Sequence, residues 1–213
     1  MRAAILGGGS CKVLVVGGAG YVGAWLVPRL LADGHEVTVM DTLWFGSGHL
    51  PKDNGNLHLR IADVRNVTKM NDACRGMDAL ICLAGITSDA MCQENVMLAR
   101  TVNIGGMMSA AISAKTAGIE RFIFASSVAV YSSTAHEATE ADELNPTTIY
   151  GECKKEAEKR IVQVLPSATI VRCASICGYS PHQRFDLTVN KMMNHAWHKG
   201  VVTVNGGEQR RCH

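Results

Sequence analysis

The sequence predicts an α/β fold in which helices flank a doubly wound parallel sheet. Short apolar runs typical of buried strands alternate with segments of helical spacing, as in a series of βαβ units. The first apolar run, residues 13–16, ends in a cluster of glycines, which indicates a tight turn from strand to helix. With 213 residues, of which 47% are hydrophobic, the chain can form one packed domain with an appendage.

The expected elements follow one another in a regular order. After the strand at residues 13–16, helical spacing runs from Val22 to Gly34 with Pro28 inside it. Further strands are expected at residues 36–41, 57–62, 79–84, 121–125 and 168–172, with a last short strand at 201–204. Further helices are expected at residues 67–74, 90–117, 150–165 and 185–198. This alternation predicts a parallel sheet.

Composition and charge argue against several classes of protein. The formal net charge is +2, which provides no basic footprint for nucleic acid and no polybasic signal for a membrane. No apolar stretch approaches the roughly 20 residues that cross a bilayer. The eight cysteines are scattered without a Cys-x-x-Cys pair, which favours free thiols in a cytoplasmic protein. No metal site is expected, since the histidines near the C-terminus have no acidic or cysteine partner at metal-binding spacing.

The glycines after the first strand match a phosphate-binding loop. Gly18, Gly20 and Gly23 fit the pattern G-x-G-x-x-G, and the wider pattern G-x-x-G-x-x-G starts at Gly17. Between a strand and a helix, such a loop lets backbone amides approach a pyrophosphate. Asp41 ends the second strand, where a carboxylate binds the adenosine ribose and repels a 2′-phosphate, so NAD is favoured over NADP. The alternative is a glycine turn with a capping aspartate.

A second carboxylate, Asp63, follows the third strand. A carboxylate in this position can cap the helix that comes next. It can equally reach the adenine of a bound dinucleotide. The residues alone leave both interpretations open.

Three polar residues in the second half of the chain suggest a catalytic site. Tyr150 and Lys154 are four residues apart, so on a helix they share one face, and an ammonium there would stabilise a phenolate and lower the pKa of the tyrosine. Taken alone, that spacing is common and is better explained by a solvated helix face. Ser127 strengthens the catalytic interpretation, because it follows the fifth strand at the edge of the sheet where ligands bind.

Taken together, these motifs resemble those of the extended short-chain dehydrogenase/reductases, the NAD-dependent epimerase/dehydratase family that acts on nucleotide sugars. The resemblance runs from Lys12 to the end of the sequence. The motifs that carry it are GGAGYVG at 17–23, Asp41, Asp63, LAG at 83–85, Asn103 in TVNIGG, SSVAVY at 126–131 and NPTTIYGECK at 145–154. The resemblance implies a Rossmann-type fold with NAD as cofactor and a nucleotide sugar as substrate.

The resemblance also implies a role for each residue of the site. Ser127 would hydrogen-bond the reacting sugar hydroxyl, Tyr150 would act as the acid and base, and Lys154 would bind the nicotinamide ribose and tune the tyrosine. The tyrosinate would remove a proton from the hydroxyl while hydride passes to NAD. The implied cofactor-binding residues are Gly17, Gly20, Tyr21, Val22, Gly23, Asp41, Asp63, Val64, Leu83, Ala84, Gly85, Asn103, Tyr150 and Lys154.

One pair of residues distinguishes between reactions of the family. Nucleotide-sugar 4,6-dehydratases carry an Asp-Glu pair directly after the serine or threonine, where this chain has Val128 and Ala129. Neither side chain can transfer a proton, so a dehydratase of that type is disfavoured. A nucleotide-sugar epimerase, or a related dehydrogenase or reductase, is therefore the expected function.

The end of the sequence suggests three regions. Members of this family typically continue beyond the segment that resembles VTVNGGEQRRCH. Residues 1–11, which include Gly7-Gly8-Gly9-Ser10, are expected to be a flexible lead-in. Residues 12–172 are expected to form the NAD-binding domain, and residues 173–213 the start of an incomplete substrate-binding region. The fold would then carry only a remnant of the small substrate domain.

Two alternative functions follow from these expectations. A chain that lacks most of its substrate domain can be a truncated, non-catalytic NAD-binding protein. The same catalytic residues can also serve a reductase of a non-sugar carbonyl.

The resemblance further implies that a homodimer can form through a four-helix bundle. Its candidate contacts are Met107, Met108, Ile112 and Ile161, which core packing explains equally well.

Overall fold

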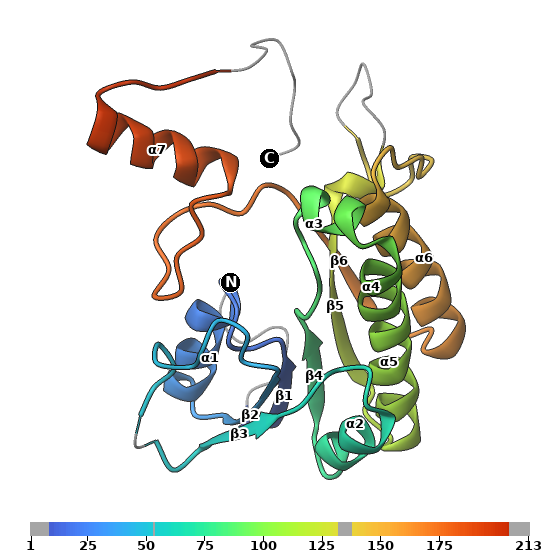
Figure 1. The fold of residues 1–213 in the computed structure, drawn as a ribbon. Coiled ribbons are helices and arrows are strands. Elements are labelled where there is room, and N and C mark those ends of the chain that lie inside the picture. Colours follow the sequence, from blue (N-terminus) through green and yellow to red (C-terminus); the bar gives the residue numbers. More distant parts are fainter. Residues whose placement is uncertain (1–8, 53, 132–137, 205–213) are drawn as a thin grey trace.

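The computed structural model describes residues 9–52, 54–131 and 138–204 (Figure 1). Most of the predicted lead-in and the last nine residues therefore lie outside the described residues. The end of the lead-in contacts the domain: the Ser10 hydroxyl donates to the carbonyl of Gly34 at 2.8 Å, and the Cys11 amide donates to Nδ1 of His35 at 3.2 Å. These contacts hold the chain in place where the first strand begins.

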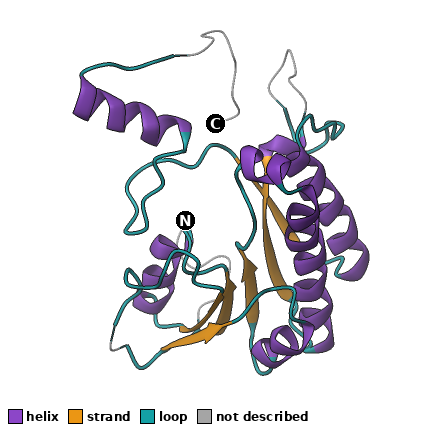
Figure 2. Cartoon of the chain, in the orientation of Figure 1, coloured by secondary structure: helices purple, strands orange, loops and turns teal. Residues whose placement is uncertain are grey.

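Six parallel strands form one sheet in the order β3-β2-β1-β4-β5-β6 (Figures 1 and 2). They are β1 (Lys12–Val16), β2 (Glu36–Asp41), β3 (Leu57–Ile61), β4 (Ala79–Cys82), β5 (Arg121–Ser127) and β6 (Thr169–Cys173). The order reverses between β1 and β4, and ligands of such sheets bind at the carboxyl ends of the strands beside that reversal. The predicted Rossmann-type parallel sheet is confirmed.

The helices lie between successive strands and after the last one. They are α1 (Gly23–Ala32), α2 (Val67–Cys74), α3 (Asp89–Glu94), α4 (Val96–Arg100), the π-helix η1 (Thr101–Gly106), α5 (Met107–Thr116), the short 3₁₀ helix η2 (Val128–Val130), α6 (Ile149–Val164) and α7 (Thr188–Lys199). The predicted helix at 90–117 is thus divided. Asn95 starts α4 by accepting from the Leu98 amide at 2.9 Å, and a π-helical stretch then separates α4 from α5.

Alternate residues of the strands pack into two cores. Leu14 and Val16 of β1 point to the face covered by α2, α5 and α6, while Val13 and Val15 point to the face covered by α1 (Figure 1). Both faces of the central strands are therefore buried, which explains their continuous apolar runs.

Two of the residues considered for a dimer contact belong to the core. Met107 and Ile161 are fully buried between the helices and the sheet, where they fill the core under α5 and α6. Ile112 of α5 is 49% exposed. The structure therefore assigns Met107 and Ile161 to core packing and leaves Ile112 on the outer face.

The predicted strand at residues 201–204 is wrong. These residues follow α7, which stands apart from the sheet and ends at Gly200 with φ +64° (Figure 2). In the described part of the chain no strand pairs with them, and Val201, Val202 and Val204 are exposed. Valines favour strands only where a neighbouring strand and a covering layer are present, and this segment has neither among the described residues.

Candidate functional site

The glycine loop joins β1 to α1 at the carboxyl edge of the sheet. Gly17 has φ +82°, and a Cβ there would lie 2.5 Å from the amide nitrogen of Ala84 at the end of β4. A Cβ on Gly23 would lie 2.2 Å from the carbonyl oxygen of Gly18. Neither position can hold a side chain, so the loop packs closely against the chain after β4 and against the start of α1, an arrangement that fits a pyrophosphate at the start of the helix.

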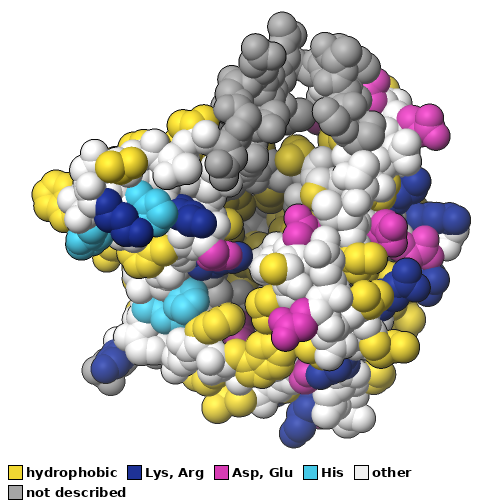
Figure 3. All heavy atoms as spheres, turned by 45° about the horizontal axis from the view of Figure 1, so that its top comes forward, with side chains coloured by type: hydrophobic (Ala, Val, Ile, Leu, Met, Phe, Trp, Pro, Cys, Tyr) yellow, Lys and Arg dark blue, Asp and Glu magenta, His cyan; other side chains and the backbone are white. Residues whose placement is uncertain are grey.

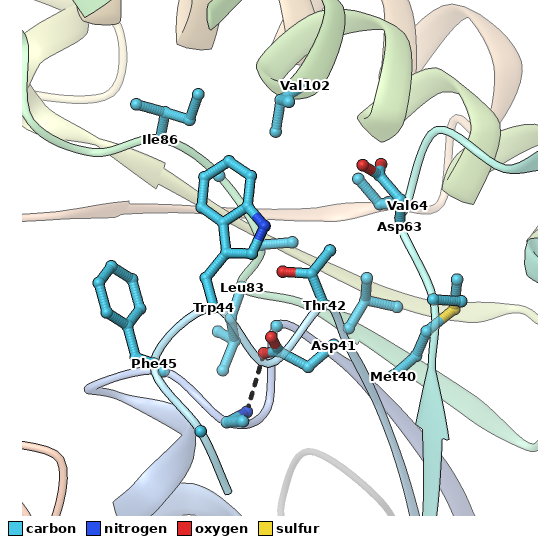
Figure 4. Close-up of a pocket in the computed structure, with 18 residues that line it drawn as sticks. Met40, Asp41, Thr42, Trp44, Phe45, Asp63, Val64, Leu83, Ile86 and Val102 are labelled. Atoms are coloured by element: carbon cyan, nitrogen blue, oxygen red, sulfur yellow. Dashed lines mark hydrogen bonds between the residues drawn. The ribbon is translucent and has the colours of Figure 1, made fainter. Parts of the chain in front are cut away.

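Asp41 lies beside this loop at the end of β2. Its Oδ2 accepts from the Ala19 amide at 3.0 Å, and its Oδ1 accepts from the Leu43 amide at 2.9 Å (Figure 4). The carboxylate therefore connects the glycine loop to the turn that follows β2. In this position it fits the adenosine ribose of NAD and disfavours a 2′-phosphate.

A pocket opens between the glycine loop and the ends of β2, β3 and β4, at an edge where hydrophobic side chains border a hollow in the surface (Figure 3). Eight of the predicted cofactor residues line it, namely Gly17, Gly20, Asp41, Asp63, Val64, Leu83, Ala84 and Gly85. The lining also contains residues that the motifs did not identify, namely Thr42, Trp44, Phe45, Ile86 and Val102. Most of these follow the predicted ends of β2 and β4, and that position is the signal that could have found them. The residues present fit the adenosine half of NAD.

Asp63 does not cap the following helix, so that interpretation is wrong. Asn66 caps α2, because its side chain accepts from the Lys69 amide at 3.1 Å. Asp63 instead accepts from the guanidinium of Arg65, with Nη2 at 2.6 Å from Oδ2 and Nε at 3.0 Å from Oδ1. This pairing lowers the pKa of Asp63, so the carboxylate at the pocket is charged at neutral pH.

Tyr21 directs its side chain away from the pocket. Its phenol donates to the carbonyl of Gly178 at 2.7 Å and accepts from Nδ2 of Asn190 at 3.0 Å. Its carbonyl accepts from the Ser180 hydroxyl at 2.8 Å. The tyrosine of the glycine loop therefore anchors the segment before α7 and does not line the pocket. Val22, at the start of α1, is 36% exposed and does not line the pocket.

Asn103 supports the loop after β4 from within the π-helix η1. Its fully buried side chain accepts from the Ile86 amide at 2.8 Å and donates to the Ile86 carbonyl at 2.9 Å. Gly85 faces the same side chain so closely that a Cβ there would lie 2.9 Å from Oδ1 of Asn103. Asn103 thus fixes the loop that lines the pocket without lining it itself.

The three candidate catalytic residues come together at the end of β5. Ser127 is the last residue of β5, and its hydroxyl accepts from the Ala129 amide at 3.1 Å, while Tyr150 lies in the first turn of α6 and Ser127 acts to lower its pKa. The start of α6 lies so close to the backbone of η2 that a Cβ on Gly151 would be 2.3 Å from the carbonyl oxygen of Ala129. Gly151 therefore determines how near the tyrosine comes to the serine.

Lys154 occupies the space behind this pair. It is 3% exposed, and its ammonium donates to the carbonyl of Ala125 at 2.7 Å. The nitrogen lies 4.6 Å from the centre of the Phe124 ring and 5.7 Å from that of Tyr150. A Cβ on Gly85 would lie 3.9 Å from the same nitrogen, so the lysine connects the candidate catalytic residues to the loop that lines the pocket.

Burial dominates the ionisation of this cluster. It raises the pKa of Tyr150 to about 12, although the hydrogen bond from Ser127 opposes the shift. It lowers the pKa of Lys154 to about 8. In this structure desolvation of the phenol is the largest effect on the pKa of Tyr150, so the lowering expected from the ammonium of Lys154 stays a prediction.

A buried ion pair lies beneath the site. Glu158, one turn after Lys154 on α6, accepts from Nη2 of Arg172 on β6 at 2.8 Å and from the Ser126 hydroxyl. Arg172 also donates to the phenol oxygen of Tyr131 at 2.6 Å. The pair links β5, β6 and α6, which are the elements that carry Ser127, Tyr150 and Lys154.

The described residues offer neither a metal-binding cluster nor a membrane-spanning helix. No group of three or more histidine, cysteine or acidic side chains lies together there in a way that could hold a metal ion. None of the helices in that part of the chain is long and apolar enough to span a membrane.

Known structures with this architecture include enzymes of nucleotide-sugar metabolism. The dTDP-glucose 4,6-dehydratase DesIV from Streptomyces venezuelae, whose structure contains NAD, aligns over 87% of this chain and 62% of its own. The TM-score is 0.78 at 25% sequence identity. The similarity therefore extends over most of the described fold.

Comparison with known sequences identifies the family. UDP-glucose 4-epimerase 4 from Oryza sativa subsp. japonica is 33% identical over 169 residues, and UDP-glucose 4-epimerase from Lactobacillus helveticus is 30% identical over 151 residues. The matches cover 74% and 70% of this chain but only 46% and 45% of the two relatives, so the chain spans less than half their length. The sequence model of the NAD-dependent epimerase/dehydratase family matches residues 13–213. The chain belongs to the NAD-dependent epimerase/dehydratase family.

Proposed function

We propose that this chain binds NAD along the carboxyl edge of its sheet and acts on a hydroxyl of a nucleotide sugar through Ser127, Tyr150 and Lys154. The observation that carries the proposal is the buried ammonium of Lys154, which lies 5.7 Å from the centre of the Tyr150 ring at the strand end that carries Ser127. A hydroxyl, a phenol and an ammonium at one strand end can orient a substrate hydroxyl and move its proton.

Each side chain has a distinct task in this proposal. Ser127 holds the substrate hydroxyl in line with the phenol of Tyr150. Tyr150 accepts the proton of that hydroxyl, and NAD, when bound, supplies the hydride acceptor at the adjoining carbon. Lys154 stabilises the tyrosinate and holds the nicotinamide ribose, which is consistent with its position between the phenol and the loop at Gly85.

Epimerisation is the reaction of this family that the local residues support best. Val128 and Ala129 follow Ser127 in the short helix η2, and neither side chain can protonate a leaving hydroxyl. Two of the relatives named above are UDP-glucose 4-epimerases. We therefore propose a nucleotide-sugar epimerase or a closely related oxidoreductase, with residues 12–172 as its NAD-binding domain and 173–213 contributing to substrate binding.

Two further properties belong to this proposal. No disulfide joins any of the seven described cysteines, and five of them are buried, which supports a reducing compartment such as the cytoplasm. Ile112 and the outer faces of α5 and α6 offer a surface on which two copies can pair as a homodimer.

A second candidate is an NAD-binding protein without turnover. The observation that favours it is the pKa of Tyr150, which burial raises to about 12, so very little of the phenol is ionised at neutral pH. In that case the glycine loop and Asp41 would bind NAD, and Tyr150 would act only as a packing residue.

Incubation with NAD and a panel of UDP- and dTDP-hexoses separates the two candidates. Turnover is followed by NMR of the sugar anomeric protons and by absorbance at 340 nm. The proposal predicts conversion between 4-epimers that is lost in Tyr150→Phe and retained in Tyr179→Phe, a variant at an exposed tyrosine. NAD binding without conversion of any sugar would favour the second candidate, and reduction of a non-sugar carbonyl alone would identify a reductase.

A further inference from the structure

The largest side chain at the pocket is that of Trp44, and the motif analysis gave it no function. It is 59% exposed although it lines the pocket. Figure 4 shows its indole lying across the pocket, with Ile86 on one side and Asp41 and Thr42 on the other. An exposed indole beside an apolar pocket offers a flat aromatic face that a bound ring can cover.

The backbone before Trp44 is held in an uncommon conformation. Leu43 has φ +57°, a region that side-chain-bearing residues seldom adopt. Its amide donates to Oδ1 of Asp41 at 2.9 Å, and its carbonyl accepts from the Gly46 amide at 2.9 Å. Strained residues of this kind persist where surrounding contacts fix them and are common at ligand clamps. The turn thus fixes the indole at the mouth of the pocket.

The topology determines which half of a dinucleotide this pocket would hold. It extends from the glycine loop and the loop after β4 over the ends of β2 and β3, which lie on one side of the strand-order reversal between β1 and β4. Ser127 and Tyr150 lie on the other side, at the end of β5 and the start of α6. With the pyrophosphate at the glycine loop, the adenosine half lies over β2 and β3. Trp44 therefore belongs to the adenosine half.

We infer that Trp44 stacks on the adenine ring of NAD and closes the adenosine half of the cofactor site. Stacking would bury the exposed face of the indole against a flat aromatic ring, as aromatic side chains do on nucleobases. The neighbouring Phe45 is less suited to this task, because its ring packs 5.4 Å from that of His182, and Figure 4 shows it to one side of the pocket. This inference rests on NAD binding but not on the substrate or on turnover.

Calorimetry with NAD and with AMP tests the inference. Replacement of a stacking aromatic residue by alanine typically weakens binding about 5- to 150-fold. Trp44→Ala is expected to lose affinity for NAD and for AMP by a similar factor, since both ligands carry the adenine. Trp44→Phe, which keeps an aromatic ring, is expected to stay within about threefold of the unmodified chain. Trp197→Ala, at an exposed tryptophan on α7, is the matched control and is expected to bind both ligands normally.

Each outcome has a definite meaning. If the unmodified chain binds NAD and Trp44→Ala binds it equally well, the inference is overturned. It is also overturned if Trp44→Ala loses affinity for NAD but not for AMP, because Trp44 would then act on the other half of the cofactor. If the unmodified chain binds neither ligand, the failure lies in the cofactor assignment. A second readout is fluorescence: with Trp25 and Trp197 replaced by phenylalanine, adenine binding is expected to quench the remaining indole.

Discussion

The phenol of Tyr21 accepts a hydrogen bond from the side-chain amide of Asn190 at 3.0 Å, across 169 positions of the chain. Tyr21 belongs to the glycine loop near the start of the described sequence, and Asn190 lies in α7 near its end. The same phenol donates to the carbonyl of Gly178, and Asn190 accepts from the amide of that residue at 2.9 Å. The two side chains and the backbone N–H and C=O of Gly178 form a closed set of hydrogen bonds that attaches the segment before α7 to the loop.

The first prediction concerns this attachment. Tyr21→Phe removes both hydrogen bonds of the phenol, which should cost about 1 to 3 kcal/mol because Asn190 loses a partner in a buried place. We expect faster hydrogen exchange at residues 178–190, whereas the amides of β1 and β4 keep their protection. Tyr179→Phe, at an exposed tyrosine, is the control. Uniform acceleration over the whole chain would show that the contact is not local.

A second prediction separates steric clash from backbone strain at glycines. Gly17 and Gly34 both have positive φ, at +82° and +87°, but only at Gly17 would a Cβ meet the backbone of Ala84. Gly34→Ala should cost about 1 to 2 kcal/mol, the penalty for a left-handed alanine. Gly17→Ala should lower the free energy of unfolding by at least about 2 kcal/mol more than Gly34→Ala, because the new Cβ would clash with the backbone of Leu83 and Ala84. Urea denaturation measures both, and equal losses would contradict the close approach of β1 and β4.

The third prediction concerns the buried pair of Glu158 and Arg172. Arg172→Met should lower the free energy of unfolding by about 3 to 5 kcal/mol, since it leaves a buried carboxylate without its cation. The double variant that also carries Glu158→Met should recover most of that loss, because no buried charge remains. Thermal and urea unfolding of the single and double variants completes the cycle. A single variant that loses less than about 1 kcal/mol would mean that water reaches the pair.

A fourth prediction follows from the lowered pKa of Lys154. In the unfolded chain this lysine titrates near 10.5, but in the folded chain near 8, so the unfolded state binds more protons between these values. The unfolding free energy contributed by Lys154 therefore rises as the pH increases from about 8 to 10.5. Lys154→Met should be about 2 kcal/mol more stable than the unmodified chain at pH 7. Removal of the buried charge stabilises the variant by about 3 kcal/mol, and loss of the hydrogen bond to Ala125 destabilises it by about 1 kcal/mol.

The control for this fourth prediction lies on the same helix. Lys159 is exposed, so Lys159→Met should change the unfolding free energy little at either pH. The difference between Lys154→Met and the unmodified chain should fall to zero near pH 10 and change sign above it, where only the lost hydrogen bond remains, and measuring it as a difference cancels the titration of the cysteines. A methionine variant that is less stable at pH 7 would contradict the burial of a costly charge.

The motifs predicted the parts of the site that depend on local sequence. Gly17, Asp41 and Lys154 each occur at a fixed distance from a strand end or a partner residue, and the strands themselves are continuous apolar runs. The fold class followed because alternating strands and helices leave few arrangements other than a doubly wound sheet.

Features that depend on distant contacts could not be predicted in this way. Asn103 supports Ile86 from a π-helix, and no local pattern separates that stretch from the α-helix expected there. The exposure of Trp44 depends on the turn after β2, and the high pKa of Tyr150 depends on how deeply α6 buries it. Each of these features depends on contacts between residues far apart in the sequence, so local sequence patterns do not predict them.

The most direct test of the account is absorbance at 340 nm after the chain, saturated with NAD, is mixed with UDP-glucose or UDP-galactose in a single turnover. We predict a transient rise in the unmodified chain that Tyr150→Phe slows by at least about 100-fold, the usual contribution of a general acid or base. The dissociation constant of NAD should change by less than about threefold in that variant. No rise with any nucleotide sugar, or an equal rise in Tyr150→Phe, would contradict the role assigned to Tyr150.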